Sequence, residues 1–426
     1  MQRYDSYKDS GIQWLGEIPS HWEVKHLRNF LTIFSEKGHG DKQLLSVTRE
    51  NGVILRDKEN KEENHNFVPD DLSGYKHVYA GDFVINKMKS WQGSYGVSDY
   101  EGIVSPAYFT CKLRGVNPKF FSRAIRSKAY IGFFMQFSKG IRVDQWDLDP
   151  NSMKDIPFVL PSLPEQQAIA SYLDTATAKI DEAIAQQQKM IDLLNERKQI
   201  IINNAVTKGL NPNAPTKPSG IDWIGNIPEH WEVKRIRYIG EANNGLTYSP
   251  NDMVDEGSGI LVLRSSNIQG GKLVFDDNVF VKNAPSKLLV RKGDIIICSR
   301  NGSASLVGKC AIVENNIYAS YGAFMMRFRS GHNNKYIYYL LTSAIGHYKQ
   351  LFSTSTINQL TLGIFADIKM PFVSNPTEQA DIANSLDVAI SEIDTTIYNA
   401  SKKIDLLHER KQIIINDVVT GKVKVS

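Results

Sequence analysis

An internal repeat restricts the possible folds of this chain more than any other feature. Residues 10–28 read SGIQWLGEIPSHWEVKHLR and residues 219–237 read SGIDWIGNIPEHWEVKRIR, with 13 of 19 positions identical. Residues 192–203 (DLLNERKQIIIN) and 405–416 (DLLHERKQIIIN) match at 11 of 12 positions. Two matches in the same order, at offsets of 209 and 213 residues, indicate a duplicated unit.

The two halves diverge between these matched ends. Residues 29–160 and 238–370 share only scattered signals, namely Gly-Asp at 81–82 and 293–294 and Pro-Phe at 157–158 and 371–372. The Trp-rich opening segments and the closing helices therefore make up a repeated frame around two variable middles. The frame is kept in both halves while the middles vary. We therefore expect the two middles to recognise different targets.

Each variable middle is predicted to be mixed α/β. Short β-rich runs alternate with turn residues and predict strands at 52–55, 83–86, 260–263 and 294–298. Aromatic and apolar residues at helical spacing predict helices near 118–134 and 334–350.

Each half closes with a long predicted helix. Apolar or small residues recur at steps of three and four from Ile169 to Ala205 and from Ile382 to Val418. This narrow stripe is typical of a helix that packs on another helix, although a helix on the surface of its own domain is an alternative. Because the two stripes share one register, we expect the helices to pair with each other, most simply antiparallel.

Terminal signals bound both helices. Proline suits a first turn, glutamate suits the positive end of the helix dipole, and glycine suits a C-terminal cap. The residues concerned are Pro164, Glu165 and Gly209 in the first copy and Pro376, Glu378 and Gly421 in the second.

Composition excludes several classes of protein. Cys111, Cys298 and Cys310 are too few and too scattered for a disulfide framework or a zinc cluster, which favours a reducing, cytoplasmic setting. No run of 18 apolar residues occurs, so we expect no membrane span. The first residues, MQRYDSYKDSGIQW, lack the apolar core of a signal peptide.

The repeated motifs resemble the specificity subunit of Type I restriction-modification systems. The resemblance rests on the opening segments (GIQWLGEIPSHWEV and GIDWIGNIPEHWEV), the starts of the long helices (LPSLPEQ and PTEQ) and the ERKQ helices. It covers essentially the whole chain, because both halves carry all three signals in the family's order. The second helix start departs from the PLPEQ form.

The resemblance implies an α+β chain with a pseudo-two-fold internal repeat. Two mixed α/β target-recognition domains would be separated by two long helices in an antiparallel coiled coil, and each domain would read half of a split target in double-stranded DNA. The expected segments are a first domain at 1–163, a first helix at 164–209, a Pro-rich linker at 210–218, a second domain at 219–375, and a second helix and tail at 376–426.

The resemblance also implies partners. Two adenine-N6 methyltransferase subunits would dock on the chain, and motor-nuclease subunits would join them. S-adenosylmethionine, ATP and magnesium would then belong to those partners. The chain itself is expected to be non-catalytic, with no cofactor and no metal site.

Missing motifs agree with a non-catalytic chain. An adenine methyltransferase needs Asn/Asp-Pro-Pro-aromatic, which does not occur. The nearest phosphate loop, residues 302–310, has five residues between its glycines instead of four and ends in cysteine. His21 and His230 repeat within Pro-x-His-Trp, and we expect a packed corner there, because no acidic or cysteine partner repeats beside them.

Basic and amide side chains where predicted strands end are the candidate DNA contacts. The net charge is only +4, but residues 164–209 (5 basic, 6 acidic) and 376–426 (6 basic, 8 acidic) are net acidic, so the basic excess lies outside the helices. The candidates are Lys87, Lys89, Trp91, Gln92, Arg142 and Gln145 in the first half and Arg264, Asn267, Arg300, Asn301, Ser303, Asn358 and Gln359 in the second.

Three alternatives remain open at this point. The chain could serve a fused methylase-nuclease of a related restriction class. It could be a self-sufficient DNA enzyme, although it shows no catalytic motif. It could be a coiled-coil adaptor that binds only protein, which salt-sensitive binding to a specific duplex would exclude.

Overall fold

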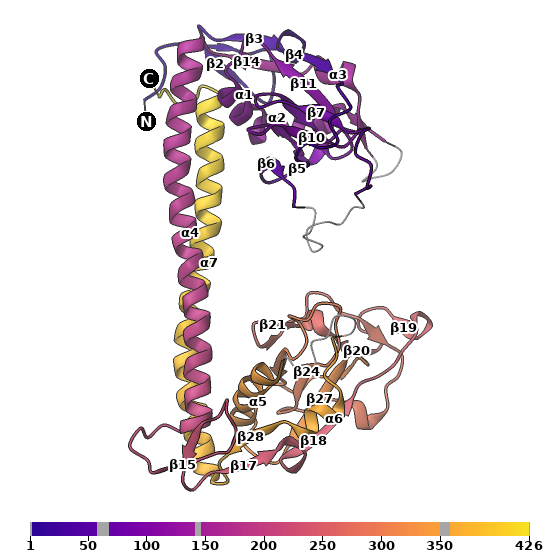
Figure 1. The fold of residues 1–426 in the computed structure, drawn as a ribbon, viewed down its shortest axis with the longest axis vertical. Helices are drawn as coiled ribbons and strands as arrows, with labels where there is room; N and C mark the ends of the chain where they lie inside the picture. Colours follow the sequence, from indigo (N-terminus) through magenta and orange to yellow (C-terminus); the bar gives the residue numbers. More distant parts are fainter. Residues whose placement is uncertain (1, 58–67, 141–145, 350–357, 426) are drawn as a thin grey trace. The chain divides into compact units, whose positions relative to one another are not determined.

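The computed structural model describes residues 2–57, 68–140, 146–349 and 358–425. The chain divides into two compact units, which we call the first unit (Met1–Gln188 with Ser401–Ser426) and the second unit (Lys189–Ala400). Each unit contains one α/β domain and a part of each of two long helices (Figure 1).

Both domains are built on a four-stranded antiparallel sheet with the same strand order. The first sheet is β4-β11-β8-β9, formed by Leu31–Phe34, Phe109–Leu113, Phe83–Ile85 and Tyr95–Val97. The second is β18-β27-β24-β25, formed by Gly240–Asn244, Met325–Ser330, Ile295–Cys298 and Cys310–Ile312. The duplication therefore extends into the variable middles, where the sequences no longer match.

The shared Gly-Asp signal has the same role in both sheets. Asp82, just before β8, lies 3.0 Å from the ammonium of Lys112 on the neighbouring β11. Asp294, just before β24, lies 2.6 Å from the guanidinium of Arg329 on the neighbouring β27. Both carboxylates are buried. A buried carboxylate needs such a partner, because removing an unpaired charge from water is costly.

The helix predicted near 118–134 is two helices, which corrects that expectation. Helix α1 spans Pro118–Ile125 and α2 spans Lys128–Phe137. Between them Arg126 leaves helical geometry (φ −92°, ψ 1°), and its guanidinium donates to the backbone carbonyl of Glu50 at 2.7 Å. Helix α5, Asn334–Tyr348, matches the prediction for the second half over the described residues.

Smaller elements complete the two domains. In the first unit these are α3 (Pro150–Lys154) and strands β1 (Tyr7–Asp9), β2 (Glu17–Pro19), β5 (Leu45–Thr48), β6 (Gly52–Leu55), β7 (Lys76–Val78), β10 (Gly102–Val104), β12 (Ser138–Lys139) and β13 (Asp147–Leu148). In the second they are α6 (Leu362–Asp367) and strands β15 (Thr216–Pro218), β16 (Asn226–Pro228), β19 (Met253–Val254), β20 (Ile260–Leu263), β21 (Ile268–Gln269), β22 (Lys272–Leu273), β23 (Phe280–Val281) and β26 (Ala319–Tyr321).

The opening segment of each half pairs with the strand that leaves its domain. Strand β3 (Glu23–His26) pairs antiparallel with β14 (Pro157–Leu160), and β17 (Glu232–Arg235) pairs with β28 (Lys369–Phe372). Both exit strands lead into a long helix a few residues later. The repeated Trp-rich segment therefore holds the beginning and the end of its domain together.

The two long helices pair antiparallel in each unit, as the stripe predicted. They are α4, Leu163–Lys208, and α7, Pro376–Val419. In the first unit the beginning of α4 shares a core with the end of α7, and in the second unit the end of α4 shares a core with the beginning of α7. Within the described residues, no helix is both long and apolar enough to cross a membrane.

Two equivalent ion pairs join these helices. Lys411 Nζ lies 2.6 Å from Asp181 in the first unit, and Lys198 Nζ lies 2.6 Å from Asp394 in the second. The two lysines are 213 positions apart in the sequence, and so are the two aspartates. This is the offset of the ERKQ repeat. The duplicated sequence is thus reproduced as duplicated contacts.

Both helices end at a glycine in the left-handed conformation, as predicted. Gly209 has φ +74° and Gly421 has φ +77°. An alanine Cβ at position 421 would lie only 2.3 Å from Cδ of Pro19, whereas one at position 209 would lie 3.4 Å from the ring of Trp231. The end of α7 therefore packs more tightly on the opening segment of the first half than the end of α4 packs on the opening segment of the second half.

We predict that Gly421→Ala destabilises the protein more than Gly209→Ala. Both changes cost about 1–2 kcal/mol because alanine disfavours the left-handed region. Only the change at 421 adds a clash with the proline ring. Calorimetric unfolding of the full chain measures the two losses, and equal losses would contradict the prediction.

Candidate nucleic-acid interface

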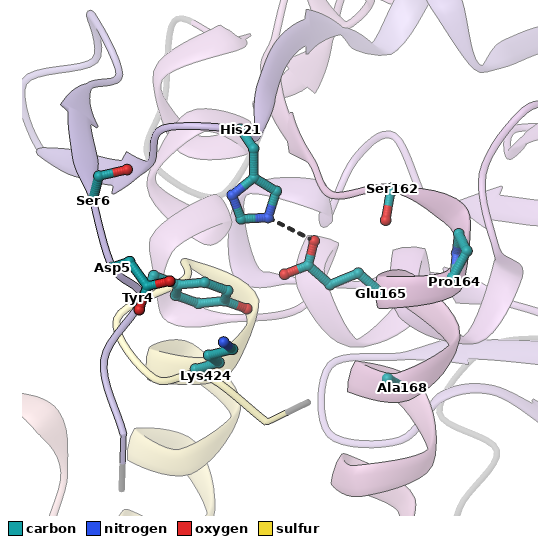
Figure 2. A pocket seen from close by; sticks show the side chains of 9 residues that line it. All are labelled: Tyr4, Asp5, Ser6, His21, Ser162, Pro164, Glu165, Ala168 and Lys424. Atoms are coloured by element: carbon teal, nitrogen blue, oxygen red, sulfur yellow. Dashed lines mark hydrogen bonds and ion pairs between the residues drawn. The ribbon is translucent and has the colours of Figure 1, made fainter.

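The corner that carries the repeated histidine is joined to the start of a long helix. In the first unit, Nε2 of His21 lies 3.0 Å from Oε2 of Glu165, as Figure 2 shows. In the second unit, Nε2 of His230 lies 2.8 Å from Oε2 of Glu378. The expectation that these histidines lack a repeated acidic partner was therefore wrong. The partners are 144 and 148 residues away in sequence, where local inspection does not find them.

Packing at this corner comes from the adjacent tryptophan and not from the histidine. Trp22 and Trp231 are fully buried, whereas the two histidine side chains are 55% and 58% exposed. The glutamates are more buried, with side chains 10% and 28% exposed. The pair between histidine and glutamate therefore orients the corner on the helix, while the buried indole supplies the apolar contact.

A buried glutamine next to each glutamate connects the helix to its domain. Oε1 of Gln166 accepts the backbone N–H of Asn117 at 2.8 Å, and Oε1 of Gln379 accepts that of Asn333 at 3.1 Å. The two asparagines are the N-caps of α1 and α5. Both glutamine amides also donate to a backbone carbonyl. The Glu-Gln pair thus fixes the opening corner and the first domain helix to one helix turn.

The candidate residues of the first domain gather where β8 ends. The ammonium of Lys87 lies 2.8 Å from Asp147, and the indole rings of Trp91 and Trp146 lie 5.3 Å apart. The stretches 86–94 and 140–146, which the sequence analysis singled out separately, are therefore brought together at their described residues. Trp91 is packed on another ring, so it is not a free stacking surface.

The remaining candidates of this domain differ in accessibility. Lys89 is exposed, whereas Lys87 and Gln92 are half-buried. Arg142 and Gln145 lie outside the described residues. Lys89 is therefore the candidate cation in the described part of this loop that is most open to a phosphate.

Three candidate stretches of the second domain surround one hollow of about 1010 Å³. Arg264, Arg300, Asn301 and Asn358 all line it. The stretches are linked directly, because Asn301 Nδ2 donates to Ser265 Oγ at 3.2 Å and Asn358 Nδ2 donates to a backbone carbonyl of the 300–303 loop. Gln359 forms a backbone bridge with Arg300. This clustering brings together residues that are almost 100 positions apart in sequence.

One side of this hollow is aromatic, which the sequence did not predict. Phe324 is 58% exposed, and the guanidinium of Arg300 lies 5.2 Å from its ring centroid. Tyr248 lines the hollow as well. An exposed aromatic ring beside a guanidinium is suited to stacking on a base or a sugar. No sequence signal marks Phe324, since an aromatic residue before a strand is normally read as core.

The other second-domain candidates have partners within the protein. Arg264 lies 2.7 Å from the carboxylate of Asp277, and its hydrogen bond lowers the pKa of that carboxyl group. Asn267 is fully buried, and its amide donates to the carbonyl of Val274 at 3.0 Å. We therefore leave Asn267 out of the proposed interface. Ser303 is exposed in the same loop as Arg300.

Part of each set of candidates lies in the same connection of the shared sheet. Residues 87–92 lie between β8 and β9, and residues 300–303 lie between β24 and β25. The segment 302–310, which has a weak likeness to a phosphate loop, runs directly into strand β25. A phosphate loop needs a helix at that point, so the segment is a turn before a strand, as expected.

Known proteins agree with the fold and the repeated frame. The sequence model of the Type I restriction modification DNA specificity domain matches residues 228–403. A protein of Methanocaldococcus jannaschii, described as the MjaX specificity subunit of a type I restriction enzyme, is 25% identical over 96% of both chains. The second half of the chain thus matches a Type I restriction modification DNA specificity domain, and the chain as a whole is similar to specificity subunits of type I restriction enzymes.

One further relative and one solved structure are also similar to this chain. The specificity subunit of the type I restriction enzyme EcoKI of Escherichia coli K12 is 23% identical over 70% of this chain and 66% of its own length. A chain from a solved structure of a type I restriction-modification system, concerned with its assembly and conformational transition, has a TM-score of 0.68 at 15% identity, covering 95% of this chain and 99% of that one. The predicted fold is confirmed, and the relatives carry the description that the sequence motifs predicted, namely specificity subunits of type I restriction enzymes.

We predict that Asn267→Ala acts on the stability of the second domain. The change leaves buried backbone groups without a partner, which costs about 1–3 kcal/mol each. The half-buried Asn358→Ala is the matched control and should change stability by less than about 0.5 kcal/mol. Urea unfolding of both variants measures the difference. A stable Asn267→Ala variant with reduced DNA affinity would instead return this residue to the interface.

Proposed function

We propose that this specificity subunit recognises a bipartite, asymmetric target in double-stranded DNA. One target-recognition domain, residues 1–163, reads one half, and the other, residues 219–375, reads the second half. The helices at 164–209 and 376–426, with the linker at 210–218, carry the two domains. The subunit directs adenine methyltransferase and motor-nuclease partners to the target.

One observation carries this proposal. The same sheet connection offers different side chains in the two domains: Lys87, Lys89 and Gln92 in one, Arg300, Asn301 and Ser303 in the other. Lysine reaches phosphates as a point charge, whereas arginine and asparagine can each make two hydrogen bonds to a base edge. Two different surfaces on equivalent loops favour two different half-sites and therefore a target without two-fold symmetry.

The repeated frame supports two identical partner subunits. The pairs His21–Glu165 and His230–Glu378, with the Lys–Asp pairs of the helices, give both units the same framework contacts. A surface that occurs twice can bind two copies of one protein. We propose that these are two methyltransferase subunits, and that S-adenosylmethionine, ATP and magnesium belong to the partners.

Exchange of one variable middle tests the bipartite target. The chain is expressed with its methyltransferase subunit, residues 29–160 are replaced by those of another specificity subunit, and methylated adenines are mapped on genomic DNA. We expect only one half of the target to change. Changes in both halves, or in neither, would contradict the proposal, as would robust methyl transfer by the isolated chain.

Single substitutions test the proposed contacts in the complex with methyltransferase. Arg300→Ala should weaken specific binding by about 1–3 kcal/mol and relax one half-site only. Lys89→Ala should weaken all sequences similarly and reduce the slope of log K against log salt by about 0.9. Lys8→Ala, on the exposed strand β1, is the control and should change neither quantity. Fluorescence anisotropy over a salt series measures both effects.

A further inference from the structure

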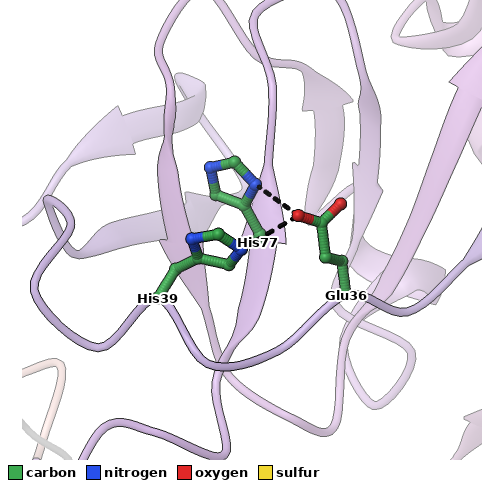
Figure 3. Close-up of side chains that lie close together, drawn as sticks. All are labelled: Glu36, His39 and His77. Carbon is green, nitrogen blue, oxygen red and sulfur yellow. Dashed lines mark hydrogen bonds and ion pairs between the residues drawn. The ribbon is translucent and has the colours of Figure 1, made fainter.

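The first domain contains a cluster that the DNA-binding proposal does not use. Glu36 and His39 lie in the loop after β4, and His77 lies on β7. Each side chain offers one ligand atom, and these atoms all lie within 4.8 Å of one another, as Figure 3 shows. Over the described residues, the second domain holds no comparable group of three.

His77 is the decisive member of this cluster. Its side chain is only 3% exposed, and its Nε2 lies 3.1 Å from Oε1 of Glu101. A carboxylate accepts hydrogen bonds, so Nε2 donates to Glu101, and Nδ1 is the ring nitrogen that is left to bind an ion. Nδ1 is buried without a hydrogen-bond partner, and it lies 3.6 Å from Oε1 of Glu36. A buried lone pair that faces a carboxylate oxygen calls for a positive charge between them.

We propose that Glu36, His39 and His77 bind a divalent transition-metal ion, with zinc as the best match. Imidazole nitrogen and carboxylate oxygen are ligands that zinc prefers, at about 2.0–2.2 Å. Around a tetrahedral ion, ligand atoms lie roughly 3.3 Å from one another. Glu36 Oε1 lies 2.9 Å from His39 Nε2 and 3.6 Å from His77 Nδ1, so both of these separations are close to that spacing. All three ligand atoms lie within 4.8 Å of one another, and a turn of the His39 ring would bring the third separation to it.

Neighbouring groups are arranged as support for such an ion. Glu101 holds the far nitrogen of His77, which is the usual carboxylate–histidine–metal arrangement. The hydroxyl of Tyr79 donates to both oxygens of Glu36, at 3.2 and 3.1 Å, and so orients this carboxylate. His39 is 35% exposed on a loop, which lets its ring turn toward the ion. Water would occupy the fourth position.

The bound ion would fasten the loop after β4 to strand β7. Glu36 and His39 belong to the loop, whereas His77 is paired through β7 with β10. Without an ion, the loop and the strand are joined by Glu36, which reaches His77, and by the stacked rings of His39 and His77, whose centroids lie 4.3 Å apart. A bound ion would join the same residues directly. None of the three ligand residues belongs to the proposed reading loops.

Zinc titration of the untagged, full-length chain after chelator treatment tests this proposal. Calorimetry should show one tight zinc ion per chain, and cobalt(II) should give the intense visible absorption of a tetrahedral site. Glu36→Gln and His39→Asn should each weaken binding at least about hundredfold, and Glu101→Gln about 10- to 100-fold. Circular dichroism of the metal-free variants checks that they remain folded.

A matched control comes from the repeat itself. His408→Asn replaces an exposed histidine by the residue at the equivalent position of the first copy, Asn195, and should leave zinc binding unchanged. If the wild type binds no more zinc than the Glu36→Gln/His39→Asn double variant, the proposal is overturned. A protonated His77 between Glu36 and Glu101 would then satisfy the cluster instead.

Discussion

The structure depends on the contact between the first turn of each long helix and the domain that precedes it. Gln166 and Gln379 are buried there, and each links a helix to the N-cap of a domain helix. An unpaired amide in this position would cost about 1–3 kcal/mol. The contact therefore favours the one orientation of helix and domain in which the glutamine finds its partner. The adjacent glutamates add the opening corner to the same helix turn. Each domain is thereby oriented by its helix rather than by a flexible tether.

This arrangement separates the parts that set orientation from the parts that can vary. Sheet order, the buried Asp82 and Asp294, and the corner tryptophans recur in both domains. The loop after β8 and the loop after β24 do not recur in sequence, and they connect equivalent strands of that common sheet. Loops tolerate substitution because few buried groups depend on them. A change of residues there can alter recognition without disturbing the frame.

Sequence patterns predicted local structure well where one segment carries the whole signal. Strands at 52–55 and 260–263 and the paired helices follow directly from side-chain periodicity. The pattern did not predict the break at Arg126, because long-range hydrogen bonds to backbone carbonyls fix it. The partner of His21 and the exposure of Phe324 depend in the same way on residues distant in sequence. Composition alone also gave no reason to join Glu36 with His77, which lie on separate elements.

The ion pairs between the long helices favour antiparallel over parallel pairing. Lys198 and Lys411 are equivalent positions of the repeat, and so are Asp181 and Asp394. If the two helices ran parallel and in register, each lysine would face the other lysine and each aspartate the other aspartate. Antiparallel packing places lysine opposite aspartate in both units. A duplicated helix with one basic and one acidic position at its contact with the other copy therefore favours antiparallel pairing. Opposite charges meet in the antiparallel direction, whereas like charges would meet in the parallel one.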